Sequence, residues 1–309
     1  MAKINSKKQS GLEWPTLLLL VIVYGSFAAL TIYATTVTLW LAVPALAVLI
    51  ALHSSLQHEV LHGHPFGNQT LSELTVFPAI GLFIPYLRFK KTHLQHHYDP
   101  NLTDPYDDPE SNYLDAIVFE TMPPVMQRLM HFNTTLLGRI TVGPLVSTGF
   151  FYREEIIRLA RGERDVWLAW VHHACGVMLV MGWLSYCATL PLWAYGVAAY
   201  LGLSLLKIRT FLEHQAHERA AARSVIVEDK GFFALLFLNN NYHAVHHAYP
   251  RTPWYQLPAI YRARRDEFLR RNGGYRYASY RQIFGLYFLI AKDGVSHPYW
   301  TRSNRSDGQ

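Results

Sequence analysis

Two long stretches of the chain carry no charged side chain. No Lys, Arg, Asp or Glu occurs at positions 14–58, and none occurs at positions 166–206. A helix needs roughly 20 predominantly apolar residues to cross a bilayer, so each stretch is long enough for two passes. The pattern predicts an integral membrane protein with four transmembrane helices in two hairpins, at residues 16–34, 37–56, 167–188 and 190–206.

The alternative for these stretches is a pair of helical hairpins buried inside a soluble protein. A surface helix of a soluble protein keeps charged or polar residues on its outer face. Neither stretch offers one charged position for such a face, so the pattern favours membrane spans. The first span follows basic residues, as a signal peptide does, but a second span follows at once, and we interpret it as a retained anchor.

Basic residues lie on one side of the predicted spans. The hairpin connections near Thr35 and Thr189 are uncharged, whereas Lys and Arg cluster at the opposite span ends. By the positive-inside rule, both termini lie in the cytoplasm and the chain sits in the cell inner membrane. The formal net charge of +6 gathers on that face, where we expect anionic lipid or an acidic protein as partner, not nucleic acid.

The segments between the hairpins complete a helical cap on the cytoplasmic side. Residues 74–87 are uncharged but too short to span, so they are re-entrant, interfacial or packed on the spans. Residues 114–164 have apolar stretches typical of amphipathic helices at the interface. We see no internal repeat, and we predict one all-α domain over residues 1–309 with a polar tail at about 300–309.

Three groups of histidines have helical spacing. Members of a group stand three or four positions apart, so they share one helical face and point into one small volume. Imidazole is a common ligand of Zn, Cu, Fe and Ni, and the two cysteines form no CxxC pattern. We predict a metal site in the cap formed by His58, His62, His93, His96, His97, His243, His246 and His247.

Other polar residues are candidates for a supporting role. His214 and His217 share a helical face beyond the fourth span, and spacing alone does not decide which is a ninth ligand. Ligating histidines usually donate their second N–H to a carboxylate or carbonyl. The candidates for this second contact are Asp104, Asp107, Asp108, Glu213, His217 and Asn239, although the three aspartates fit a solvated turn equally well and the asparagines at 239–241 also fit a helix N-cap.

Two other kinds of protein compete with this interpretation. The string from His58 to His62 fits HExxH, the zinc metalloprotease pattern in which Glu59 would be the general base. That motif leaves the other two histidine groups unexplained. A metal transporter or sensor is the second competitor, but a transporter places ionisable ligands at mid-membrane, whereas these groups lie beyond the span ends.

Taken together, the histidine groups, the two hairpins and their order resemble the membrane fatty acid desaturase superfamily over roughly residues 40–265. Within that superfamily, the strings at 102–109, 209–214 and 253–258 resemble a bacterial desaturase-like subgroup. The resemblance implies two iron ions bound by the eight histidines named above, with His214 matching the family's additional ligand.

The resemblance also implies the chemistry. We expect an O2-dependent oxidoreductase that abstracts hydrogen from a fatty acyl chain to introduce a double bond. A hydroxylase or ketolase acting on a lipid or carotenoid begins with the same abstraction and remains the alternative. Electrons are expected from an external donor such as a ferredoxin-like protein, because the resemblance covers no haem or flavin domain.

Overall fold

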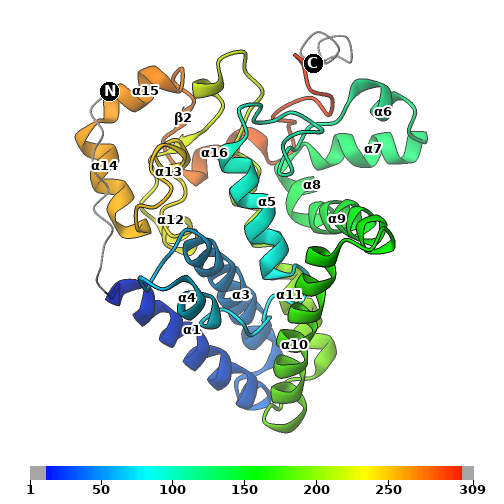
Figure 1. The fold of residues 1–309 in the computed structure, drawn as a ribbon, viewed down its shortest axis with the longest axis vertical. Helices are drawn as coiled ribbons and strands as arrows, with labels where there is room; N and C mark the ends of the chain where they lie inside the picture. The colour runs from blue at the N-terminus through cyan, green and yellow to red at the C-terminus, as the bar shows by residue number, and fades with distance from the viewer. Residues whose placement is uncertain (1–11, 301–309) are drawn as a thin grey trace.

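The computed structural model describes residues 12–300, and their regular structure is almost entirely helical. Long helices gather at one end of the molecule, at the bottom of Figure 1, and short helices form a cap at the other end. The long helices are α1 (Trp14–Ile32), α3 (Leu39–Leu61), α10 (Arg164–Tyr186) and α11 (Leu192–Thr210), and the short α2 (Ala34–Val37) joins the first two. The predicted tail, apart from Trp300, and the basic residues before position 12 lie outside the described residues.

The cap is built from the segments between and after the hairpins. Its helices are α4 (Gln69–Leu74), α5 (Tyr86–Tyr98), α6 (Ala116–Glu120), α7 (Pro124–Asn133), α8 (Leu136–Thr141), α9 (Gly143–Ala160), α12 (Phe232–Leu236), α13 (His243–Ala248), α14 (Leu257–Ala263), α15 (Arg265–Arg271) and α16 (Tyr280–Tyr287). Short 3-10 turns lie at η1 (Ala220–Ala222) and η2 (Trp254–Gln256). The strands β1 (Ile226–Val227) and β2 (Arg276–Tyr277) form one parallel pair.

Three helices are long and apolar enough to cross a membrane: α1, α3 and α10. The predicted fourth span corresponds to α11, which has 19 residues but carries Lys207 and Arg209 in its last turn. It is not among the three that qualify by length and composition. Each helix begins or ends a few residues from its predicted boundary, and α3 extends the most, because it continues from the span into His58.

Small residues bring α11 very close to α3. A β-carbon at Gly202 would lie 2.7 Å from the Cγ2 atom of Ile50 and 3.2 Å from the carbonyl oxygen of Ala47. The facing alanines are completely buried at Ala198 and Ala199. Small side chains of this kind let membrane helices approach through their backbones. The pair α3 and α11 therefore forms the centre of the helical bundle.

The uncharged segment that follows α4 packs on the long helices and forms no helix until α5 begins. The amide of Ala79 donates to the carbonyl oxygen of Gly176 on α10 at 3.4 Å, and the Tyr195 hydroxyl of α11 donates to the Ile80 carbonyl at 2.6 Å. Val76 and Ile80 are buried. Of the three arrangements expected for this segment, the described structure shows packing against the spans.

A buried ion pair fixes α5 to α9. Arg88 and Glu155 form three short N–O contacts of 2.8 to 3.0 Å, and both side chains are almost fully buried. The indole nitrogen of Trp170 on α10 donates to the same carboxylate at 3.0 Å. One buried carboxylate therefore ties α5, α9 and α10 together beneath the cap.

We expect Glu155→Gln to lower the free energy of unfolding by about 3–5 kcal/mol, because Arg88 then stays buried without a charged partner of equal quality. Denaturation of the purified protein in detergent measures the change. The matched control is Glu163→Gln, which breaks a partly exposed pair with Arg158 and should cost about 0–1 kcal/mol. Equal losses in the two variants would contradict this account of the buried pair.

Candidate metal centre

Three cap-facing helix segments carry the histidine groups. His58 lies in the last turn of α3, and His62 is the residue that caps its end. The helix α5 starts after Pro85, whose fixed φ suits a helix start, and it carries His93, His96 and His97. The third group lies on α13, one helical segment of six residues. The predicted helical placement of all three groups is therefore what the structure shows.

The side chains of these segments gather with His214 into two compact groups. Within each group the candidate ligand nitrogens all lie within 4.8 Å of one another, and most of the histidines are buried. The first group is His58, His62, His93, His97 and His246. The second group is His96, His214, His243 and His247.

The spacing of the nitrogens fits metal ligation. Neighbouring Nε2 atoms within the groups lie between 2.9 and 3.1 Å apart. Two imidazole nitrogens bound at right angles to one metal ion, each about 2.1 Å from it, lie about 3.0 Å apart. The Nε2 atoms of His58 and His62 are buried without a hydrogen-bond partner among the described residues. Each group can therefore hold one metal ion.

Carboxylates and an amide orient three of the imidazoles from outside the groups. His96 Nδ1 donates to Asp108 at 2.7 Å, and His93 Nδ1 donates to Glu110 at 2.9 Å. The Asn240 Oδ1 atom lies 3.2 Å from His243 Nδ1. Such contacts fix the tautomer and the ring direction of a ligand. Asp108 was among the candidates, whereas sequence reasoning missed Glu110 and Asn240.

The expectation that Asp104 orients a histidine needs correction. Asp104 accepts the amides of Tyr106 and Asp107, which makes it a turn residue of the loop. Asp107 accepts from the side-chain amide of Asn101 at 3.4 Å. The residues of this acidic loop that contact histidines are Asp108 and Glu110, whose carboxylates point inward.

The expectation for Asn239 is also revised, whereas Glu213 does lie beside a histidine of the second group. The Asn239 amide donates to the Trp254 carbonyl, and no asparagine of this run caps α13, whose N-cap is Tyr242. Glu213 accepts from Asn240 at 2.8 Å and lies 3.7 Å from His243 Nδ1, so it supports that imidazole through the asparagine.

The two histidines left tied by spacing are separated in the fold. His214 lies in the second group, where its Nε2 atom is 2.9 Å from those of His96 and His243. His217 instead accepts the amide of Arg219 through Nδ1 at 3.0 Å. The chain leaves helical conformation after α11, so the helical face that the two were expected to share does not form.

Burial keeps most of these imidazoles neutral. Burial, with neighbouring imidazoles, lowers the pKa of His214, His243, His246 and His247 well below the usual value. The pKa of His96 differs, because burial is outweighed by Glu110 and Asp108, which raise it to about 9. A metal ion held by His96 would displace one proton of the ring, and Nδ1 would keep its hydrogen bond to Asp108.

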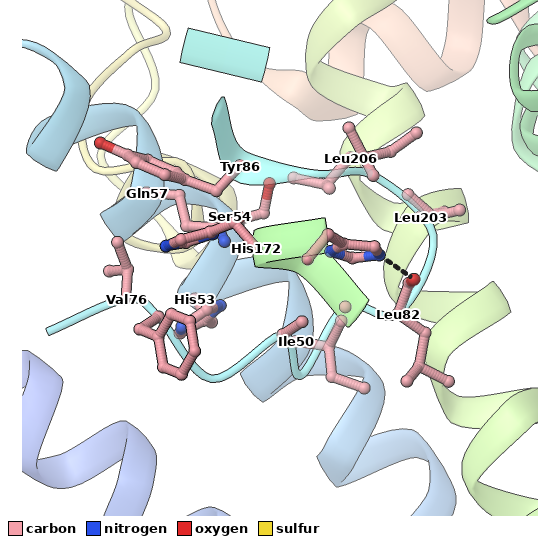
Figure 2. Close-up of a pocket in the computed structure, with 15 residues that line it drawn as sticks. Ile50, His53, Ser54, Gln57, Val76, Leu82, Tyr86, His172, Leu203 and Leu206 are labelled. Carbon is pink, nitrogen blue, oxygen red and sulfur yellow. Dashed lines mark hydrogen bonds between the residues drawn. The ribbon is translucent and has the colours of Figure 1, made fainter. Parts of the chain in front are cut away.

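A cavity of about 50 Å³ lies along the turns of α3 that precede His58. Figure 2 shows Ile50, His53, Ser54 and Gln57 of α3 on one side and Leu203 and Leu206 of α11 on the other. Its wall also includes Val76, Leu82, Tyr86, His172 and His173. By its volume, the space can hold a few water-sized groups.

The histidines of this cavity have packing contacts. His173 donates through Nε2 to the Leu82 carbonyl at 2.8 Å, and the ring of His172 meets the ring of Phe77 edge to face (Figure 2 labels His172 and Leu82). His53 contacts the Tyr24 hydroxyl at 3.0 Å. None of the three belongs to a metal group among residues 12–300.

Comparison with known proteins decides the family. A family model described as fatty acid desaturase matches residues 12–279, a region that includes all nine histidines of the two groups. The chain belongs to the fatty acid desaturase family. Fatty acid desaturases are oxidoreductases that act on lipid at the membrane, which agrees with the three apolar helices. No curated protein matches the chain in a sequence comparison.

The protease alternative fits this desaturase-family site poorly. Glu59, the expected general base, accepts the backbone amide of Trp254 at 3.1 Å and belongs to neither histidine group. His58 and His62 share their group with three further imidazoles. A catalytic zinc has three protein ligands and an open position, so five imidazoles in one group disfavour it.

We expect Asp108→Ala to weaken metal binding about 10–100-fold, because His96 loses the carboxylate that orients it. Competition of the purified protein with a chelator measures the affinity. Asp104→Ala is the matched control, since it removes a carboxylate from the same loop without touching a histidine. If both variants lose affinity equally, the loop as a whole matters and the specific contact does not.

Proposed function

We propose that this desaturase-family protein is a di-iron, O2-dependent oxidase that introduces a double bond into a fatty acyl chain. The main support is the division of nine imidazoles into two groups, each able to hold one metal ion. His58, His62, His93, His97 and His246 would hold one iron, and His96, His214, His243 and His247 the other. Two redox metals beside a membrane suit oxidation of an unactivated C–H bond.

The bound iron would supply O2 reduction, and the chain's own residues would position the ions and the lipid. In desaturation the acyl chain gives up two hydrogen atoms, which are two protons and two electrons, and an external donor gives two more electrons. With two protons from solvent, O2 leaves as two waters. The cavity between α3 and α11 reaches Gln57, the residue before His58, and we propose that the acyl chain approaches the first histidine group from that side.

The main experiment compares lipids from cells with and without the gene by mass spectrometry. We expect a lipid that has lost two hydrogens in the cells that carry it. A gain of one oxygen would instead support the hydroxylase or ketolase alternative, which uses the same site. Unchanged lipids in cells that make the folded, iron-loaded protein would overturn the proposed oxidase.

Metal analysis tests the ligand set. We expect about two irons per chain in purified protein, because the histidines form two separate groups. His214→Ala should lose iron and activity together, since it removes one of only four imidazoles from the second group. His217→Ala should keep both. One zinc and no iron, or iron loss in His217→Ala alone, would show that the assignment is wrong.

The proposed placement in the membrane extends beyond the three qualifying helices. We propose that α11 is the fourth span and that the chain works as one domain in the cell inner membrane, with its termini and histidines in the cytoplasm. Lys207 and Arg209 at the end of α11 support this, because basic residues favour the cytoplasmic side.

The electron donor is proposed to be a small acidic carrier such as a ferredoxin. The helix α14, which packs on α13, and the helix α15, which packs on α14, expose several arginines, among them Arg262, Arg270 and Arg271. Charge of this kind steers an acidic partner toward the third histidine segment.

The basic cytoplasmic face should therefore both set the orientation of the chain in the membrane and bind the electron donor. Reporters fused after Arg164 should read cytoplasmic and reporters inserted at Thr189 external.

Turnover with a reconstituted carrier should fall steeply as salt rises, because charge steering is screened over about 8–10 Å near physiological ionic strength. Salt-independent turnover would contradict the proposal of an acidic carrier. A cytoplasmic signal from the reporter at Thr189 would contradict the second hairpin.

A further inference from the structure

The cavity between α3 and α11 has an apolar side and a polar side. Leu203 and Leu206 of α11 line the apolar side, whereas the polar lining residues come from α3 and α10 (Figure 2). Polar and ionisable residues within membrane spans are rare because they are costly there, and they mark functional sites. We call the polar residues the polar wall, and its members are His53, Ser54, Gln57, His172 and His173.

Two imidazoles of the polar wall use only one of their two nitrogens. The Tyr24 hydroxyl donates its proton to the Thr75 carbonyl at 2.8 Å, so its oxygen accepts from His53 Nε2 at 3.0 Å. His173 Nε2 donates to the Leu82 carbonyl at 2.8 Å. In a neutral imidazole that donates through one nitrogen, the other is an acceptor. His53 and His173 thus each keep one acceptor nitrogen that has no hydrogen bond within residues 12–300.

The other three members of the polar wall have no hydrogen bond through their side chains. Ser54, Gln57 and His172 form none with the described part of the chain, and the ring of His172 meets only that of Phe77. The neighbouring Ser55 differs, because its hydroxyl donates to the Leu236 carbonyl at 2.8 Å. Polar groups in a protein interior nearly always have a hydrogen-bond partner. The polar wall therefore has hydrogen-bonding capacity for a group that enters the cavity.

The polar wall lies close to the metal centre. Gln57 stands three positions after Ser54, so the two share a face of α3, and His58 of the first histidine group comes directly after Gln57. From Ser54 to His58 the helix rises about 6 Å. A lipid chain that approaches the first histidine group from this cavity therefore passes the polar wall on its way.

The mixture of donors and acceptors favours a hydroxyl group as the occupant. The free imidazole nitrogens accept, the Gln57 amide can donate and accept, and so can the Ser54 hydroxyl. A hydroxyl on the ligand also does both. A carbonyl or ether oxygen only accepts, so it leaves the imidazole nitrogens unpaired, and an unsubstituted hydrocarbon pairs with nothing. None of the described lining residues is Lys or Arg, so an anionic group is not favoured.

We propose that the polar wall binds a hydroxyl group on the lipid chain, which makes the substrate a hydroxylated lipid. The proposal rests on the proposed function and adds the class of substrate to it. The cavity of about 50 Å³ has room for a few water-sized groups, such as a hydroxyl and the carbon that bears it. The hydroxyl would hold the chain in register, so that the carbons beyond it lie near the first histidine group.

The test is a binding measurement that needs no turnover. The full-length protein in a neutral detergent is titrated with a radiolabelled long-chain fatty acid methyl ester and with its monohydroxy derivatives, in which the hydroxyl is moved along the chain. We expect one position to bind about tenfold more tightly than the unsubstituted parent, as two or three hydrogen bonds allow. The methyl ether at that position cannot donate and should lose most of the gain.

A series in which no hydroxylated probe binds more tightly than the parent, including one in which no probe binds, would overturn the proposal. That is the result expected if the polar wall holds only water molecules, since the hydroxyl then has no site of its own. Equal binding of the hydroxyl and its methyl ether would overturn the role of the imidazole acceptors.

Variants assign the preference to the polar wall. Ser54→Ala and Gln57→Leu break no side-chain hydrogen bond within the described protein, so both should fold, and each should reduce the preference for the hydroxylated probe about three- to tenfold. Binding of the parent ester should stay unchanged and shows that the cavity is intact. The matched control is Ser185→Ala, an exposed serine of α10 outside the cavity, which should keep the full preference. A preference that survives in both Ser54→Ala and Gln57→Leu would overturn the assignment.

The outcome separates this proposal from the proposed function. A hydroxyl preference that depends on Ser54, in a protein that oxidises no lipid, would keep the binding site and overturn the oxidase. Oxidation of unsubstituted chains by a protein without any hydroxyl preference would keep the oxidase and overturn the binding site.

Discussion

Nine imidazoles confined in one buried volume are the constraint on which the rest of the structure depends. Their Nε2 atoms approach to about the distance expected for ligands of one ion, and burial favours the neutral form in most of them. Neutral imidazoles that face one another present nitrogen lone pairs, and there are too few N–H donors nearby to form hydrogen bonds with all of them. Metal ions satisfy those lone pairs, so metal binding and the folding of the cap are expected to be coupled.

Helical geometry explains how three segments build two groups. At about 100° per residue, positions four apart differ by about 40°, whereas the members at +3 and +4 differ by about 100°. His93 and His97 therefore enter the first group while His96 turns to the second. On α13 the roles reverse, because His243 and His247 enter the second group and His246 the first. The helices α5 and α13 thus each contribute to both groups, which holds them against each other, whereas His58 and His62 both enter the first group.

The same geometry separates what the sequence could predict from what it could not. Spacing within a segment is local, so the three histidine groups, their helices and three of the spans were predictable. The choice of orienting partners depends on loop conformation. The acidic loop turns Asp108 and Glu110 inward and leaves Asp104 in a turn, and Asn240 takes the contact expected of its neighbour Asn239. Neighbours of equal chemistry cannot be distinguished by pattern alone.

The membrane helices and the cap impose separate requirements that meet at the end of α3. Close packing at Gly202 brings α11 against α3 and sets the walls of the cavity, while α3 continues past the bundle to deliver His58 and His62. The same close packing places Lys207 and Arg209, at the end of α11, near the cap helix α8. The basic residues, the cavity and the metal site therefore all depend on the packing of α3 against α11. The cavity lies between these helices, and the histidines of α3 and the basic residues of α11 lie a turn or two beyond it.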